Sequence, residues 1–473
     1  MNISWAGTVA VRLLLLAAAG AVLSSCVSTR NSLFLEIDEA AEGGNYETAV
    51  ASLEEESDTL YGNRDGVLYY LDSGMLHFYN RDYKSSIERF QEAERLIEEY
   101  FTRSVSQAAT SLLLNDNQID YAGEDFEDIY LNVFNAVAFM QQEDYDAAFV
   151  EVRRMNNKLN LLEDKYQGLA ARYNQSDDAE VEIEPGESRF YNSAFGRYLS
   201  LIMYRGDGDY DGARIDWEQL ETAFREQSNI YAHPNPFERD IIEPSDQARL
   251  SVLAFTGQAP IKRAVTLYVV TFDNRVDILY AEEGQAGELI PEGYTSFGFP
   301  VEGGYQFKFQ LPRMVLRGSD VERIRVVADG APIGELGLLE NMEQVALDTF
   351  QIKEPIIFLK TVTRTIVKGV LAQKGKEQMQ RAGQESGSML GLAAGLVGSV
   401  ATGVAVDASE QADLRVSRYF PAYAYAGEWE LEPGTYDIAI EYYGTGGLMY
   451  VEEVGPVEVD REGLNVVSSF YNN

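Results

Sequence analysis

The chain has 473 residues, with 76 acidic side chains against 38 basic ones, two histidines and one cysteine. A formal charge of −38 argues against a nucleic-acid binder, which needs clustered Lys and Arg. So few Cys and His also argue against a metal site built from these residues. At 45% hydrophobic residues the chain can still bury sizeable cores, and its length suggests about three domains. No cofactor is predicted.

Residues 1–25 have the pattern of a lipoprotein signal peptide. The apolar run over 13–22 suits the central part of such a peptide and is too short to span a bilayer. Leu23, Ser24 and Ser25 precede Cys26, which resembles a bacterial lipobox. We therefore expect lipidation at Cys26 and attachment to a membrane through the N-terminal lipid. Val27 stands where Asp would retain a lipoprotein in the inner membrane, which favours the periplasmic side of the outer membrane.

Residues 26–245 contain four similar short segments that predict α-helical repeats. Each has Asn or Asp, then Tyr, then a small residue three positions after the tyrosine. The pattern resembles the start of the second helix in a tetratricopeptide-repeat (TPR) hairpin, where the polar residue caps the helix. Gly74, nine residues before the second of these tyrosines, stands where the first helix of such a hairpin has a small residue. The four segments start at Asn45, Asp82, Asp144 and Asp209.

TPR-like domains commonly bind protein partners on their concave surface, and we expect this role for the domain as a whole. For each aromatic residue taken singly, including Phe78 and Phe90, packing between helices is the interpretation we favour.

One acidic segment of this domain also fits the EF-hand calcium pattern. Carboxylates at positions 1, 3, 5 and 12 are supplied by Asp207, Asp209, Asp211 and Glu218, with Gly at position 6. However, Asp209 also begins a helical repeat, and Arg214 stands where EF-hands have an aliphatic residue. We therefore favour a plain acidic turn and keep calcium as the weaker alternative.

Two segments, 246–352 and 407–473, predict β-structure. Residues 264–271 and 323–327 are rich in β-branched residues, whereas 305–311 and 436–442 alternate between apolar and polar residues. We expect antiparallel β-sandwich modules, or one sandwich that both segments complete. The fold class predicted for the whole chain is therefore α+β, with a helical N-terminal domain and a β-rich region interrupted by a helical insertion.

The insertion, 353–406, begins with a basic stretch. Residues 353–381 hold seven basic residues against two acidic ones, the reverse of the balance in the whole chain. Lys360, Arg364 and Lys368 are spaced four apart and form one stripe on a predicted amphipathic helix. Such a stripe can face anionic lipid or a partner.

Residues 386–406 follow without a single charge and are rich in Gly and Ala. Gly391 and Gly395 have the spacing of a helix-packing motif. We rank a packing helix first, either buried within the fold or forming a homo-oligomer, with membrane contact second and a full membrane span third.

No motif of a familiar enzyme class occurs, so no catalytic residue is assigned and no enzyme is predicted. Several stretches together resemble a family of TPR-containing bacterial outer-membrane lipoproteins. The resemblance implies an envelope protein with helical repeats that accompanies other small envelope lipoproteins. The residues that carry it are 192–199, 208–217, 259–262, 359–371, 410–415, Pro421 and 431–436, whereas 416–420 depart from the family pattern.

Asp413 and Arg415 lie two residues apart on what we expect to be a strand. They are either contacts for a ligand or partner, or a structural ion pair that fastens the insertion to the β-domain. We favour the structural ion pair.

These patterns together predict a lipid-anchored adaptor or scaffold that binds a protein partner in the cell envelope. The alternatives are a solute- or glycan-binding envelope lipoprotein and an envelope enzyme without recognisable motifs. A deep pocket with converging carboxylates and aromatic residues would favour these alternatives. A broad shallow groove with no buried titratable group would favour the adaptor.

Overall fold

The structure, a computed structural model, describes residues 33–106, 116–175, 183–283, 289–299, 301–304, 306–385 and 411–472. Cys26, the signal-peptide region 1–25 and the uncharged segment 386–406 lie outside the described residues, as do the side chains beyond residue 366 of the insertion helix, including that of Lys368. A helical N-terminal region precedes a sheet-rich C-terminal region, so the α+β prediction is confirmed. Among the described helices, none combines the length and apolar character that crossing a membrane requires.

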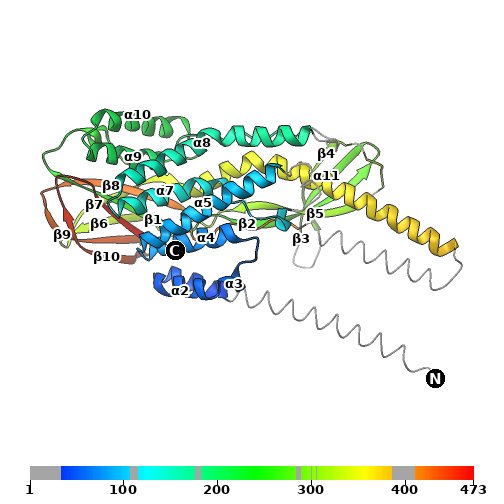
Figure 1. The fold of residues 1–473 in the computed structure, drawn as a ribbon, viewed down its shortest axis with the longest axis horizontal. Helices are drawn as coiled ribbons and strands as arrows, with labels where there is room; N and C mark the ends of the chain where they lie inside the picture. The colour runs from blue at the N-terminus through cyan, green and yellow to red at the C-terminus, as the bar shows by residue number, and fades with distance from the viewer. Residues whose placement is uncertain are drawn as a thin grey trace, which may run out of the picture.

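The helical region consists of hairpins of antiparallel helices, preceded by a helical stretch over 33–42 (Figure 1). All four predicted helix starts are confirmed. The side chains of Asn45, Asp82, Asp144 and Asp209 each accept a hydrogen bond from a backbone N–H three residues later. The helices are α2 (Tyr46–Glu55), α3 (Ser57–Leu60), α4 (Gly66–Tyr79), α5 (Tyr83–Ser106), α7 (Asp125–Met140), α8 (Tyr145–Asn174), α9 (Ala194–Gly206) and α10 (Tyr210–Glu226), with short 3₁₀ turns η1 (Asp116–Gln118) and η2 (Arg239–Ile242).

The residue directly before each capping residue adopts the left-handed conformation. Gly44 and Gly208 have φ of 74° and 76°, and Arg81 and Glu143 have φ of 60° at the equivalent positions. Glycine tolerates this conformation, whereas Arg and Glu adopt it at some cost. The four turns therefore share one backbone geometry although only two of them carry the glycine that would reveal it in the sequence.

Seven strands from both β-rich segments form one sheet, in the order β10-β9-β6-β7-β8-β1-β11. All neighbours are antiparallel except β1 and β11, which pair in parallel from Leu250–Asn465 to Thr256–Tyr471. The prediction of a purely antiparallel sheet is therefore wrong at this one pair, because the last strand returns to the edge beside β1. The strands are β1 (Ala248–Thr256), β6 (Arg323–Ala328), β7 (Ala331–Asn341), β8 (Tyr423–Leu431), β9 (Gly434–Gly444), β10 (Gly447–Val459) and β11 (Asn465–Tyr471).

The two edge strands of this sheet, β10 and β11, come together. Glu452 on β10 accepts hydrogen bonds from Ser469 Oγ (2.6 Å) and Phe470 N (3.1 Å) on β11. Tyr450 and Tyr471 stack with their ring centroids 4.9 Å apart. The sheet therefore curls around a core of its own, which includes Ile440.

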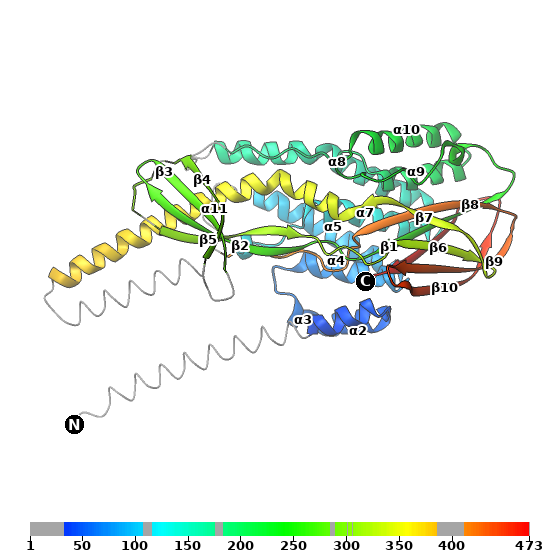
Figure 2. The same cartoon turned by 180° about the vertical axis from the view of Figure 1, so that it is seen from behind.

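A second sheet has four strands in the order β4-β3-β2-β5 and lies at the other end of the elongated molecule (Figure 2). Its helix partner is α11 (Met342–Glu385), which begins before residue 353 and continues through Pro355. On α11, Ile352 and Ile356 pack against α8, while Val362 and Ile366 pack on the four-stranded sheet. The strands are β2 (Ile261–Phe272), β3 (Arg275–Glu283), β4 (Leu289–Gly298) and β5 (Gln306–Val315).

The first helices of the hairpins pack against the seven-stranded sheet. Phe255 of β1 contacts the rings of Phe78 on α4, Phe134 on α7 and Phe195 on α9, and it stacks with Phe470 of β11. The alternate residues of β1, such as Val252, belong to the core inside the curled sheet. Both faces of β1 are therefore buried. The sheet covers the side of the hairpins that is formed by α4, α7 and α9.

Candidate functional site

A cavity of about 190 Å³ lies where the helical region, the four-stranded sheet and α11 meet. Seven parts of the chain line it: the end of α5, the segment 116–124, α8, strands β2 and β5, α11 and the segment 411–415. This cavity is called the junction cavity below. Its charged lining residues are Asp116, Asp120, Glu124, Lys165, Lys262, Lys353, Lys360, Arg364, Asp413 and Arg415.

Glu124, which precedes α7, is shared by two lysines from the sheet region. Lys262 of β2 donates to its Oε1, and Lys353 of α11 lies 2.5 Å from its Oε2. Burial disfavours the charged ammonium of Lys353, but Glu124 and Asp125 outweigh burial and raise its pKa above the ordinary lysine value. Lys353 therefore stays protonated at neutral pH.

Asp116 pairs with the predicted basic stripe of α11. Lys360 Nζ lies 2.6 Å from Asp116 Oδ1, and Arg364, also buried, is close enough to help lower the pKa of Asp116. As whole residues, Lys360 and Arg364 are only 6% and 2% exposed. The interpretation of these two residues as a lipid-facing stripe is therefore wrong, because α11 packs this face against the acidic helical region.

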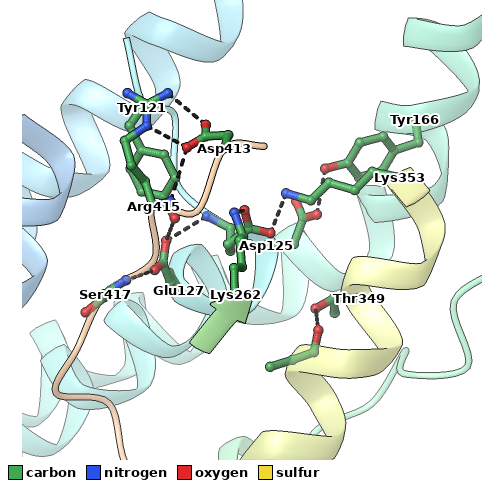
Figure 3. Close-up of polar contacts among 12 residues, drawn as sticks. Tyr121, Asp125, Glu127, Tyr166, Lys262, Thr349, Lys353, Asp413, Arg415 and Ser417 are labelled. Atoms are coloured by element: carbon green, nitrogen blue, oxygen red, sulfur yellow. Dashed lines mark hydrogen bonds and ion pairs between the residues drawn. The ribbon is translucent and has the colours of Figure 1, made fainter. Parts of the chain in front are cut away.

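Asp125, the first residue of α7, accepts hydrogen bonds from two side chains of α8. Lys165 Nζ and the Tyr166 hydroxyl donate to its two oxygens at 2.7 Å and 2.6 Å. Burial acts to raise the pKa of Asp125, but Lys165, Lys353 and the Tyr166 hydroxyl together outweigh it, so the pKa is lowered. Figure 3 shows Tyr166 and Asp125 beside Lys353 and Lys262.

Glu127 lies behind Glu124 and is fully buried. It accepts hydrogen bonds from the Tyr121 hydroxyl (2.7 Å), from Glu124 N (2.7 Å) and from the backbone N–H of Ser417 (Figure 3). Burial and the neighbouring charge of Glu124 raise the pKa of Glu127 to about 7. Its charge therefore changes near neutral pH, at the point where the C-terminal segment meets α7.

Asp413 and Arg415 form the structural ion pair that we favoured, with 2.8 Å between Arg415 Nη2 and Asp413 Oδ2. The segment around them is not a strand, and although Lys262 of β2 lies close enough to help lower the pKa of Asp413, Arg415 makes its other hydrogen bonds elsewhere. Arg415 instead donates to the backbone oxygens of Asp116 (2.7 Å) and Ile119 (3.0 Å) and lies near Asp65. The pair thus attaches the segment that follows the insertion to the helical region.

The junction cavity is rich in cations relative to the rest of the chain. Six of the 38 Lys and Arg residues line it, but only four of the 76 Asp and Glu residues do. Apolar and aromatic residues form the remainder of its wall, among them Leu169, Tyr173, Ile356 and Pro312. Lys262 and Glu124 were not singled out from the sequence, because a single Lys in a strand and a single Glu before a helix carry no spacing signal.

A second feature is an open groove of about 850 Å³ on the outer side of the helical region, called the outer groove below. It runs between α5 and α8, over α7. Ile97 and Ile129 are buried at its base, and Leu161 on its rim is 50% exposed. Its charged residues are Glu94, Arg95, Glu98, Asp125, Asp128, Arg154, Lys158, Asp164 and Lys165.

The EF-hand pattern does not form a loop. Asp207 ends α9, Asp209 caps α10, and Asp211 and Glu218 lie within α10. The last two carboxylates pair with Arg214 at 2.8 Å and 2.6 Å. The calcium alternative is therefore wrong, since a helix cannot wrap these carboxylates around one ion. Across the described ranges, no group of three or more His, Cys, Asp or Glu residues could hold a metal ion.

Comparison of the chain with protein-family models, with curated proteins and with solved structures finds no match.

Proposed function

We propose that this protein is a lipid-anchored adaptor of the bacterial cell envelope, acylated at Cys26 and facing the periplasm from the outer membrane. The lipobox pattern and the family resemblance support the anchor and the location. The outer groove is the observation that carries the adaptor role. It lies on the side of the hairpins that the chain's own sheet leaves open.

In this proposal the helical region is a TPR-like array. Its concave face, which usually binds a partner, packs against the chain's own sheet. The four equivalent capped turns and the close contact of Gly74 with the ring of Phe90 support the TPR-like assignment. The seven-stranded sheet, curled on itself with its edges joined, serves as a sandwich-like body that fills the concave side. A partner would then bind to the second helices, α5 and α8.

The occupant proposed for the outer groove is an amphipathic helix of a partner protein. A groove between two helices with an apolar base accepts the apolar stripe of a third helix. The charges around it have both signs, so a partner helix with alternating charges on its flanks would match them. Exposed Leu161 would form the central apolar contact.

The test is site-specific photo-crosslinking in intact cells, with the crosslinker at Leu161 and, as a control, at Ile215 on α10. Ile215 is similarly exposed at 47% and lies outside the groove. We expect an adduct from Leu161 alone, in which the crosslinked peptide is an amphipathic helix of another envelope protein, and we expect Ile97→Asp to abolish it. Absence of an adduct at Leu161, or equal adducts at both positions, would contradict docking in the groove.

The anchor is tested separately by Cys26→Ala. The variant should leave the membrane fraction, because acyl chains supply about 0.8 kcal/mol per buried methylene and no other anchor is proposed. Retention of the variant in the membrane fraction would show that attachment has another source, and 353–406 would then be the segment to examine.

A further inference from the structure

We infer that the outer groove selects a basic amphipathic helix, with Lys or Arg on both flanks of its apolar stripe. The inference rests on the proposed adaptor role and names the chemistry of the helix that the groove would accept. It starts from the charges of the groove lining, which comprise four cations and five carboxylates. The charges that already have a partner within the chain are the first to be set apart.

Every cation of the groove lining is paired with a carboxylate of the chain itself. Arg95 on the rim lies between Glu92 and Glu99. The three cations of α8 pair at 2.7–3.0 Å with carboxylates of α5, α7 and α8 itself: Arg154 with Glu94 and Glu151, Lys158 with Glu94 and Asp128, and Lys165 with Asp125. A partner helix with acidic flanks would therefore have to break one of these pairs to gain a cation.

Two carboxylates of the lining, in contrast, have no cationic partner within the described part of the chain. Glu98 lies on α5 and Asp164 lies on α8, and both residues are exposed. They occupy opposite rims, because α5 and α8 form the two sides of the groove. A helix lying between them can place a cation against each rim, so the groove favours cations on both of its flanks.

The surroundings of the groove add negative rather than positive charge. With Glu92, Glu99 and Glu151, which pair with cations of the lining, the cluster contains eight carboxylates and four cations. Arg103, which pairs with Glu99, and its second partner Asp120 add one charge of each sign. Carboxylates therefore outnumber cations by four, so a basic helix is attracted to the groove and an acidic one is repelled.

Two lysines of α8 bound the part of the groove that can accept an apolar stripe. Lys158 bridges α5 and α7 through carboxylates of both helices. Lys165 lies 4.6 Å from the ring centroid of Phe101 on α5 and also pairs with α7. The two lysines are two helical turns apart, about 10 Å, and Leu161, which is 50% exposed, lies between them. The apolar stripe that fits is therefore about two turns long.

The test compares the binding of three synthetic helical peptides to the acylated chain in nanodiscs of zwitterionic lipid, with empty nanodiscs as the blank. The first peptide has a two-turn leucine stripe with Lys on both flanks. The second has the same stripe with Glu flanks, and the third has Lys flanks with Ser in place of the leucines. We expect the first to bind about tenfold more tightly than either of the others at low ionic strength. Equal binding of the first peptide and either of the others would overturn the inference.

Charge reversal at the two rims provides the matched variants. Glu98→Lys combined with Asp164→Lys should transfer the preference to the Glu-flanked peptide, and both positions are exposed, so the fold should be kept. Glu221→Lys combined with Asp146→Lys changes the net charge equally, at exposed positions outside the groove lining, and should keep the preference for the Lys-flanked peptide. The same preference in both double variants and the wild type would show that the general acidity of the chain attracts the peptide, and would overturn the inference.

The crosslink at Leu161 in intact cells separates this inference from the adaptor role on which it rests. A crosslinked helix flanked by Lys and Arg supports both. A crosslinked helix of another envelope protein that is flanked by Asp and Glu would overturn the inference of a basic partner and leave the adaptor role standing. Absence of an adduct at Leu161 would remove the docking site itself, and the inference with it.

Discussion

At the scale of single residues, the charge of Arg415 interacts with several partners at once. Its guanidinium joins Asp413, Asp65 and two backbone oxygens of the segment 116–119. Exposed pairs behave differently, because solvent screens them and their side chains lose freedom on pairing. Arg95, for example, lies between Glu92 and Glu99 and is 56% exposed.

We predict that Arg415→Met lowers the free energy of unfolding by about 3 kcal/mol, because it leaves the largely buried carboxylate of Asp413 without its partner and removes two hydrogen bonds to backbone oxygens. Arg95→Met serves as the matched control and should cost less than about 1 kcal/mol. Urea unfolding followed by circular dichroism measures both. If the two variants lose the same stability, the pair does not fasten the C-terminal segment.

The raised pKa of Glu127 predicts that the stability of the fold depends on pH, and it sets the sign of that dependence. The unfolded carboxyl ionises near 4.5, whereas the folded one keeps its proton until about pH 7. Its contribution to stability is therefore fully present below about pH 4.5 and is lost as the pH rises through about 7. Glu127→Gln is neutral throughout, so its stability relative to wild type should rise by roughly 3 kcal/mol between pH 4.5 and 8.

Urea unfolding of wild type and Glu127→Gln at several pH values measures this difference. Glu88→Gln, at an exposed position on α5, controls for the loss of one negative charge. A stability difference between Glu127→Gln and wild type that stays constant with pH would show that Glu127 does not titrate between the two states as described.

At the scale of elements, the hairpin of α4 and α5 depends on the absence of a side chain at Gly74. A Cβ there would lie 2.7 Å from Phe90 Cε1, which is closer than van der Waals contact allows. Gly168 in the interior of α8 provides the contrast, since a Cβ there meets nothing within 4 Å. Position 74 therefore has no room for a side chain, whereas position 168 does.

Gly74→Ala should lower the free energy of unfolding by about 1–3 kcal/mol, through the displacement of Phe90. Gly168→Ala should raise it by about 0.5–1 kcal/mol, because Ala restricts the unfolded chain and favours the helix. Thermal and urea unfolding of both variants against wild type give the two signs. A stable Gly74→Ala protein would mean that Phe90 can move aside without loss of packing.

At the scale of the whole molecule, the helices and the seven-stranded sheet share one core. Phe255 and Phe470 of the sheet contact aromatic rings of α4, and Phe255 also reaches α7 and α9. The helical region therefore owes much of its apolar burial to β1, which follows it along the chain, and to β11, near the other end of the sequence.

We predict that residues 33–245 alone do not form a stable domain. Without β1 and β11, the apolar faces of α4, α7 and α9 would be exposed to water, which costs about 25 cal/mol per Å². The fragment should show no cooperative thermal transition and should bind a hydrophobic dye, whereas residues 33–473 should melt cooperatively. A fragment that melts in one sharp transition would show that the helical region is an independent domain.

The sequence by itself was sufficient for the α+β class and for the helix starts at Asn45, Asp82, Asp144 and Asp209. These features depend on local chemistry, since a polar side chain caps its own helix and periodicity is read within one segment. Gly74 was likewise predictable, because its role follows from the spacing within one hairpin. The left-handed turns at Arg81 and Glu143 were not, because neither residue type signals that conformation.

Only the tertiary structure decided which distant segments meet. The basic stripe of Lys360 and Arg364 had the pattern of an exposed surface, yet it is buried against Asp116 because α11 crosses the acidic helical region. Similarly, the parallel pairing of β1 with β11 depends on where the chain returns, which no local pattern encodes. The junction cavity is lined by seven segments, so its charged residues come together only through long-range packing.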